Sequence, residues 1–203
     1  MISLSKNQKV DLRKPSGVFL SKVTVGLGWD PINLPRPKPS WKNLFGLLSP
    51  AANIDCDASV ICCRNGKYQH NTSDLVYFAN LEHSTGAVKH MGDNLTGEGE
   101  GDDEQILLDL NLLPGVFDRL IFVVNIFSAK SRGQHFGMVQ NCFIRICDET
   151  GAEFCRYNLS ENYDGCCSMI FGELLRTPNG WEFKACGQGL PECNIHKICE
   201  MFA

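Results

Sequence analysis

The segment at residues 93–104 holds the residue types best suited to binding a metal ion in this chain. It reads Asp-Asn-Leu-Thr-Gly-Glu-Gly-Glu-Gly-Asp-Asp-Glu, with six carboxylates among twelve residues and no Lys or Arg. Crowded carboxylates repel one another, so a folded chain keeps such a cluster most readily when a cation lies among them. Ca²⁺ takes roughly six to eight oxygen ligands, and the alternating glycines let the backbone bend tightly and turn carbonyl oxygens inward. We therefore predict a calcium-binding loop here.

A solvated acidic loop is the alternative interpretation of this segment, because glycine-rich runs of like charge are often disordered. Two apolar runs of strand character argue against it, at residues 76–78 before the segment and at residues 106–110 after it. We therefore expect the acidic segment to lie between strands of the folded protein.

The segment does not fit an EF-hand, although Asp93 and Glu104 occupy the first and twelfth positions of such a loop. Leu95 and Gly97 stand where inner ligands belong, and Glu98 stands at the position of the invariant glycine. The flanking runs also have strand rather than helix character. We therefore exclude an EF-hand.

Three more aspartates lie near the ends of predicted strands. Asp55 and Asp57 flank Cys56 before a predicted strand, and residues two apart in an extended chain point the same way. Such a pair suits chelation, and a pair of exposed turn aspartates is the alternative. Asp30 ends another predicted strand. If these strand ends meet the acidic segment, the carboxylates suffice for two Ca²⁺ ions that share ligands.

The charge of the chain is negative mainly because of this one segment. The 203 residues carry a formal net charge of −4, and without the six acids of the segment the remainder is positive. Localised acidity argues against a nucleic-acid partner, which requires clustered Lys and Arg. No apolar run approaches the length of a membrane span, and the N-terminus has no apolar stretch of a signal peptide. We expect a cytoplasmic protein without a transmembrane segment.

Eleven cysteines are unusual for such a chain, but their number is odd and no secretion signal precedes them, so a disulfide framework is not indicated. The adjacent pairs at residues 62–63 and 166–167 would point to opposite faces of a strand, which does not suit zinc chelation. We expect most cysteines to be small buried apolar residues. Near the C-terminus, we expect Cys193 and Cys199 to be accessible thiols.

Strand signals dominate the elements that must position these residues. Many short β-prone runs are separated by Gly, Asn and Pro, which predicts a mainly β fold: a two-sheet antiparallel β-sandwich. Tight hairpins are expected at residues 65–66, 150–151 and 179–180. The run at 119–127 is apolar for most of its length and is expected to be a central strand. The predicted strands cover residues 22–27, 58–63, 75–78, 106–110, 119–127, 142–147, 153–158, 168–175 and 181–187.

The end of the chain changes to a helical period. Ile195, Ile198, Cys199 and Phe202 fall at positions i, i+3, i+4 and i+7, which predicts a C-terminal amphipathic helix packed on the sandwich. A short helical turn is expected at residues 131–136.

The proline-rich segment at residues 31–53 stands apart from the strands. It contains five prolines, a composition that favours extended and semi-rigid backbone. We expect a single domain spanning residues 1–203 with this segment as an insertion. Its aromatic and apolar residues either fold back on the body or form a docking segment for another protein.

Several motifs along the chain occur together in a recognisable order. They lie at residues 3–6, 23–30, 55–59, 92–104, 132–137, 143–145, 171–174 and 181–189. With these motifs the chain resembles the TerD family of bacterial tellurium-resistance and stress-response proteins. The resemblance runs nearly from end to end and is interrupted by the proline-rich segment, where the family usually has a much shorter connection. The acidic segment is its longest and most specific part.

The resemblance implies a β-sandwich that binds Ca²⁺, with two ions expected, and no established enzymatic activity. The family is also similar to eukaryotic cyclic-AMP-binding proteins. Backbone carbonyls of Leu95, Gly97 and Gly99 are implied as additional ligands. The side-chain ligands that the resemblance implies are Asp30, Asp55, Asp57, Asp93, Asn94, Glu98, Glu100, Asp102, Asp103 and Glu104.

We therefore expect a calcium-binding, non-catalytic module of a tellurium-resistance or chemical-stress response system that acts through protein–protein assembly. Other proteins of a stress-response assembly are the expected partners, with other TerD-family members among the candidates. A compatible interpretation is a scaffold in which calcium orders the loops and the proline-rich insertion recruits the partner.

A metal-dependent enzyme acting on a phosphorylated or nucleotide substrate is the competing hypothesis. Such a site usually adds Lys or Arg for the phosphate, and the acidic segment has none. Arg132, His135 and Arg145 would supply this charge only if the fold brought them near. A nucleophile triad is disfavoured because no Gly-x-Ser-x-Gly motif occurs.

Overall fold

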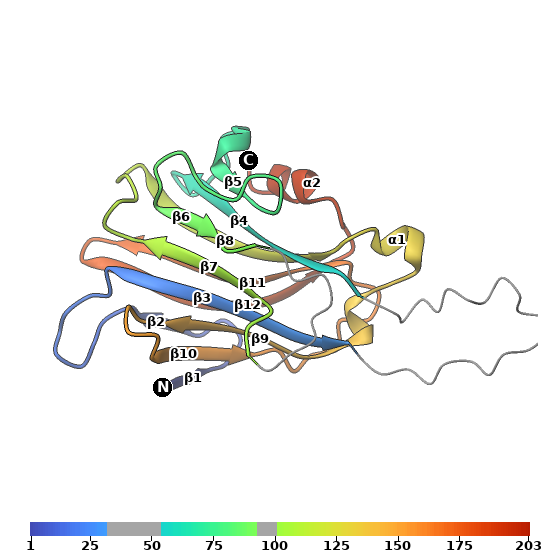
Figure 1. The fold of residues 1–203 in the computed structure, drawn as a ribbon, viewed down its shortest axis with the longest axis horizontal. Helices are drawn as coiled ribbons and strands as arrows, with labels where there is room; N and C mark the ends of the chain where they lie inside the picture. The colour runs from blue at the N-terminus through green and yellow to red at the C-terminus, as the bar shows by residue number, and fades with distance from the viewer. Residues whose placement is uncertain (32–53, 93–100) are drawn as a thin grey trace, which may run out of the picture.

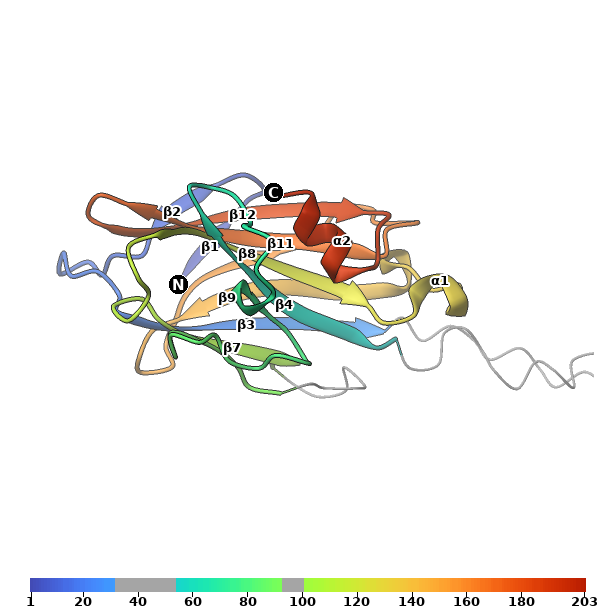
Figure 2. The same cartoon turned by 90° about the horizontal axis from the view of Figure 1, so that it is seen from above.

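Two six-stranded sheets face each other in the computed structural model, which describes residues 1–31, 54–92 and 101–203 (Figures 1 and 2). The first sheet consists of β1 (Ile2–Leu4), β3 (Lys22–Pro31), β6 (Val88–His90), β7 (Glu104–Asp109), β9 (Val139–Cys147) and β10 (Glu153–Asn158). The second sheet consists of β2 (Lys9–Asp11), β4 (Cys56–Arg64), β5 (Leu75–Val76), β8 (Phe117–Ile126), β11 (Ser168–Thr177) and β12 (Gly180–Leu190).

The strand order is β1-β10-β9-β3-β7-β6 in the first sheet and β2-β12-β11-β8-β4-β5 in the second. Among these described strands, every neighbouring pair is antiparallel except β1 and β10, which are parallel. The prediction of a mainly β, two-sheet sandwich with antiparallel pairing is confirmed. The predicted hairpins at residues 150–151 and 179–180 connect β9 with β10 and β11 with β12.

Strand β7 alternates between buried and exposed side chains, as a strand with one face in the core does. Ile106 and Leu108 are buried among the core residues, whereas Gln105 and Leu107 point outward. Glu104 begins this strand at an inward position and is itself buried. The alternation therefore places a carboxylate at the inner face of the first sheet, toward the second.

Strand β8 lies in the middle of the second sheet and is covered on both faces. Leu120, Phe122 and Val124 belong to the core between the sheets. On the opposite face, Ile121 and Val123 pack in a separate cluster with residues of α2 (Ile195–Glu200). The predicted central strand and the predicted C-terminal helix are therefore both confirmed, and Figure 2 shows α2 lying over the second sheet.

Three short strands were not predicted, namely β1, β2 and β6, each of three residues. They lie at sheet edges, where few residues carry a periodic signal. The remaining helical turns are η2 (Thr72–Asp74), α1 (Ala129–Arg132) and η3 (Phe136–Met138), and the last two overlap the predicted turn at residues 131–136.

The predicted proline-rich insertion lies outside the described residues, apart from the backbone of Pro31 at the end of β3. Its role and the single-domain organisation around it stay predictions. Among the described residues, no helix combines the length and the apolar character needed to cross a membrane.

Candidate metal centre

One end of the sandwich collects the acidic residues of three separate segments. Strand β3 ends there and β4 begins there, on the right in Figure 1. Strand β7 also begins at this end, because Leu27 near the end of β3 pairs with Glu104 in antiparallel register. The carboxylates near residues 30, 55–57 and 101–104 therefore lie at the same end of the sandwich, although they are far apart in the sequence.

Glu104 connects the two sheets at this end. Its Oε2 accepts a hydrogen bond of 2.7 Å from the backbone N–H of Ala58 in β4. Strand β5 pairs with β4 only from Val60 onward, so the Glu104 side chain satisfies a strand N–H that β5 does not reach. The same oxygen lies 3.1 Å from Nε2 of His90, and both side chains are buried. The start of β7 is thus fixed to the start of β4.

Asp55 and Asp57 lie beside this connection, around the buried thiol of Cys56. Burial is the largest cause that raises the pKa of Cys56 well above its ordinary value, and Cys142 and the charges of Glu104, Asp57 and Asp55 raise it further. Cys56 and Ala58 belong to the core between the sheets, whereas Asp57 lines a pocket with Asn125 and Lys130 on the other face of β4.

Asp57 is itself buried and is held from the neighbouring strand. Its backbone lies opposite Asn125 of β8, and Asn125 Nδ2 lies 3.3 Å from Asp57 Oδ2. Residues 55 and 57 thus differ in exposure, because Asp55 is only half-buried. The alternative of two exposed turn aspartates does not describe this pair.

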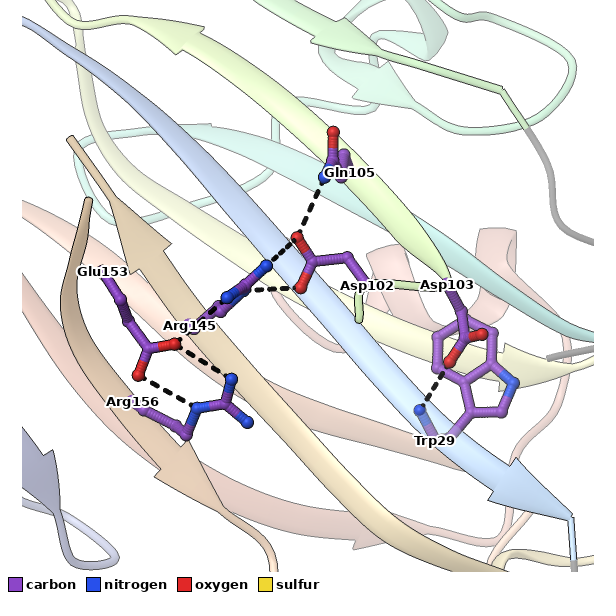
Figure 3. Close-up of polar contacts among 7 residues, drawn as sticks. All are labelled: Trp29, Asp102, Asp103, Gln105, Arg145, Glu153 and Arg156. Carbon is purple, nitrogen blue, oxygen red and sulfur yellow. Dashed lines mark hydrogen bonds and ion pairs between the residues drawn. The ribbon is translucent and has the colours of Figure 1, made fainter. Parts of the chain in front are cut away.

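Asp103 and Asp30 form the second half of the acidic region. The backbone N–H of Trp29 donates to Asp103 Oδ2 at 2.7 Å (Figure 3). The pKa of Asp103 is raised above its ordinary value of 3.8, mainly by burial, and the charges of Asp30 and Asp102 add to the rise while the Trp29 hydrogen bond opposes it. Asp103 is therefore a carboxylate whose ionised form would gain from a nearby cation.

A backbone irregularity positions Asp30. The register between β3 and β9 shifts between Gly28 and Asp30, and such bulges redirect side chains. Across it, Asn141 has a left-handed φ of 54°, a conformation that asparagine tolerates better than most residues. Its Nδ2 donates to Asp30 Oδ2 at 2.7 Å. Asn141 thus orients the predicted ligand Asp30.

A pocket of about 660 Å³ opens between these groups. Its lining includes Asp30, Asp103, Asn141, Cys142 and Arg156. The pKa of the Cys142 thiol is raised to about 12, first by burial and then by the charges of Asp30 and Asp103. Cys142 and Cys56 belong to the same core cluster between the sheets, so both halves of the acidic region border the same end of the core.

Asp102 takes part in an ion pair. Arg145 donates from Nε to Oδ1 at 2.7 Å and from Nη2 to Oδ2 at 3.0 Å, and Gln105 donates to Oδ2 at 3.0 Å (Figure 3). This bidentate geometry is the strong form of the Arg–carboxylate pair. The pKa of Arg145 is raised, mainly by its hydrogen bond to Asp102. Both oxygens of Asp102 are therefore already in use.

Two glycines of β3 make room for this arrangement. A Cβ added at Gly26 would lie 2.3 Å from the carboxylate carbon and both oxygens of Asp102. A Cβ at Gly28 would lie 2.2 Å from the ring of Phe143. The Gly-x-Gly of this strand is thus explained by close approach of neighbouring side chains.

The structure brings five of the predicted ligands together at one end of the sandwich, with Asp102 in its ion pair with Arg145. The described residues contain no group of three or more His, Cys, Asp or Glu side chains arranged to hold a metal ion by themselves. The five are Asp30, Asp55, Asp57, Asp103 and Glu104. The predicted ligands that lie outside the described residues are Asp93, Asn94, Leu95, Gly97, Glu98, Gly99 and Glu100.

The supporting residues of this region were not predicted as part of the site. His90, Asn125 and Asn141 are isolated polar residues in the sequence, and no spacing marks them. They become visible only through pairing between strands. The glycines at positions 26 and 28 did indicate that other groups pack closely against β3 here, since glycine inside a strand often marks close approach of a neighbouring group.

The cations considered for a phosphate are occupied elsewhere. Arg145 is paired with Asp102 and also lies 3.2 Å from Glu153. Arg132 lies over the ring of Phe127, and His135 lies 3.1 Å from Asp164. None of these contacts directs a positive charge into the pocket beside Asp30.

The cysteines are all free, and all except Cys166 and Cys193 are buried. The prediction that most are buried apolar residues is confirmed. The prediction of an accessible Cys199 is wrong, because this side chain is 1% exposed on the buried face of α2, in the cluster with Ile61 and Ile198. Cys193, in contrast, is half-buried.

A two-sheet β-sandwich that gathers carboxylates at one end is the class of protein defined by this fold and this region. A sequence model of the TerD domain matches residues 1–202. The chain is 46% identical over 202 residues to stress response protein SCP2 of Bacillus subtilis, and the match covers 99% of this chain and 98% of that protein. It is 40% identical over 190 residues to the tellurium resistance protein TerD of Serratia marcescens, covering 93% of this chain and 90% of that protein. The chain therefore belongs to the TerD family.

A solved structure supports the fold independently. The crystal structure of a homologue of the telluride resistance protein TerD from Streptomyces coelicolor A3(2) matches with a TM-score of 0.63 at 21% identity. The match covers 91% of this chain and 98% of that one. At this level of identity the likeness concerns the sandwich fold alone.

Proposed function

We propose that this chain is a non-catalytic calcium-binding module of a tellurium-resistance or chemical-stress response, and that it acts through assembly with other proteins. The observation that carries the metal part is the contact between Glu104 and the Ala58 N–H, because it joins the acidic segment to the start of β4. Carboxylates from three segments then share one region, and carboxylate oxygens are the ligands that Ca²⁺ prefers.

Asp30, Asp55, Asp57 and Asp103 are the described side chains best placed to contribute to such a site. Glu104 lies among them and also has a structural role. Asp102 is a weaker candidate, because Arg145 and Gln105 occupy both its oxygens. The coordination would be completed by oxygens of residues 93–100, which the sequence predicts as ligands. When bound, the ion would supply the positive charge that these carboxylates otherwise lack.

Partners and location belong to the same proposal. Relatives are named as stress response and tellurium resistance proteins, which supports a role in such a response. Eleven free cysteines suit a reducing compartment, and we propose a cytoplasmic location. We propose protein partners of the same response, including other TerD-family members; the one described cation that lines the acidic pocket, Arg156, is paired with Glu153.

Calorimetry on chelator-treated protein tests the calcium proposal. We expect heat of Ca²⁺ binding and a rise in the melting temperature, since a ligand that binds only the native state stabilises it. Asp103→Asn should weaken binding by about tenfold or more, whereas Asp11→Asn should not change it. Asp11 is an exposed residue opposite Glu182 near the start of β12, so it controls for the loss of one negative charge. No binding heat and no melting shift in the unsubstituted protein would refute the proposal.

The raised pKa of Asp103 predicts a pH dependence for the metal-free protein. Because Asp103 binds its proton more tightly in the folded state than in the unfolded chain, protonated Asp103 contributes most to stability at low pH. This contribution is lost as pH rises from 3.8 through the raised pKa of the folded state. As pH rises across this range, we therefore expect Asp103→Asn to become more stable relative to the unsubstituted protein. Urea unfolding of both proteins measures this change. A difference that is independent of pH would contradict the assignment.

A further inference from the structure

A pair of thiols lies where β11 begins and where the chain approaches α2, beside a pocket that Asp57 also lines. Cys193 packs against the core cluster that contains Cys167, and the residues beside them are joined, because Ser168 Oγ donates to the carbonyl of Glu192 at 2.6 Å. The backbone of Cys167 is fixed between two strands, since its N–H donates to Leu190 and its carbonyl accepts from Ile126, both at 2.9 Å. Cys193 lies in the turn before α2, where its N–H donates to Glu192 at 3.0 Å. One thiol is therefore held rigidly and the other is carried by a short connection.

This pair differs from the other neighbouring thiols in its access to solvent. Cys142 adds to the rise in the pKa of Cys56 that burial causes, and Cys63 adds to that of Cys199, but all four are buried. Cys193 instead lines a pocket of about 580 Å³ and is half-buried. A small polar reagent can therefore reach Cys193 without opening the core.

The charges around the pair are mixed. Lys130 lines the same pocket, and its ammonium opposes the effects of burial and of Cys193, which together raise the pKa of Cys167 to about 11. The pKa of Glu192 is lowered mainly by the hydrogen bond from the backbone N–H of Asn194, then by that of Cys193 and by the charges of Lys197 and Lys130. A nearby ammonium favours a thiolate and stabilises negative charge that develops on sulfur during attack. The pocket thus gives Cys193 access to solvent and a neighbouring cation, and the turn that carries Cys193 is hydrogen-bonded to the residue after Cys167.

We propose that Cys167 and Cys193 form a peroxide-sensitive dithiol that closes to an intramolecular disulfide. Cys193, the accessible thiol, attacks one oxygen of hydrogen peroxide as its thiolate; the O–O bond breaks and, after proton uptake, one water leaves with Cys193 as a sulfenic acid. The sulfur of Cys167 then attacks the Cys193 sulfur, and the sulfenic oxygen leaves as a second water. Two thiols are oxidised, one peroxide is reduced to two waters, and the S–S bond connects the start of β11 to the turn before α2.

Peptide mapping of the full chain after peroxide treatment tests this proposal. Remaining thiols are alkylated under denaturing conditions, and the protein is digested with trypsin and a glutamate-specific protease. Cleavage then separates residues 162–173 from residues 193–197, and the second peptide contains Cys193 as its single cysteine. We expect these two peptides to be joined, with a mass lower by two hydrogen atoms than their sum, and to separate on reduction.

Three serine variants assign the bond. The joined species should survive in Cys166→Ser and disappear in Cys167→Ser and Cys193→Ser. Cys166 is the matched control, because it is the other half-buried cysteine and shares the peptide, while its sulfur lies against Gly189. Melting curves of the reduced variants check that each is folded.

Two results would overturn the proposal. One is a peroxide-treated, folded protein in which Cys193 carries only higher oxides or a bond between chains. The other is a joined species that persists in Cys167→Ser. Calcium has no part in this reaction, so its outcome is independent of the calorimetry.

Discussion

Replacing Glu104 with Leu is expected to lower the free energy of unfolding by about 2–4 kcal/mol in the presence of a chelator. The substitution removes the acceptor of the Ala58 N–H and the partner of His90, both in a buried environment. A buried strand N–H without an acceptor carries most of this cost. Glu104→Gln keeps a carbonyl oxygen for the Ala58 N–H, so it should lose less, about 1 kcal/mol.

Urea denaturation measures both variants. Glu161→Leu is the control, since Glu161 is an exposed glutamate paired with Lys6 and such surface pairs contribute little; its change should stay within about 0.5 kcal/mol. Calcium titration of Glu104→Gln then reports on the metal site in a protein that remains folded. If Glu104→Leu were as stable as the unsubstituted chain, Glu104 would not connect the two sheets as described.

The second large effect is expected at Gly26. In Gly26→Ala the new methyl group would lie 2.3 Å from the carboxylate of Asp102, which Arg145 holds in place. Either the carboxylate leaves the guanidinium or the strands separate, and we expect a loss of about 2–4 kcal/mol. Gly115→Ala is the matched control, because a Cβ there meets no atom within 4 Å.

A double-mutant cycle isolates the cause. Asp102→Ala removes the obstructing carboxylate, so adding Gly26→Ala to that background should cost at least about 1 kcal/mol less than in the unsubstituted chain. Denaturant unfolding of the four proteins gives the coupling directly. If the losses of unfolding free energy from Gly26→Ala and Asp102→Ala were additive in the double variant, Gly26 would be required for a reason other than space for Asp102.

The repetitive parts of this fold were predictable, because they leave a periodic signal. Residues 153–158 form a strand with the predicted bounds, and the helical spacing of Ile195, Ile198 and Cys199 marks α2. β6 was not predictable, because three residues at an edge carry too little pattern. Its importance lies in His90, whose contact with Glu104 depends on how β6 and β7 pair.

The sequence predicted which residue types form the candidate site, but it did not predict the role of each residue. Carboxylates at strand ends indicated a cation site, and the fold brings Asp30, Asp55, Asp57 and Asp103 to one end. Asp102 and Asp103 are adjacent in sequence, and no pattern distinguishes them. The chain bends at Asp103 just before β7, and Asp102 meets Arg145 while Asp103 meets the Trp29 N–H. Only the register of the neighbouring strands separates these roles.

An anomalous-scattering experiment on crystals grown with Ca²⁺ tests the proposed calcium site directly. If cations hold the acidic strand ends together, anomalous peaks should lie about 2.3–2.6 Å from carboxylate oxygens of Asp103 and of at least one of Asp30, Asp55 and Asp57. Crystals with saturating Ca²⁺ that show no peak at this end of the sandwich would contradict it.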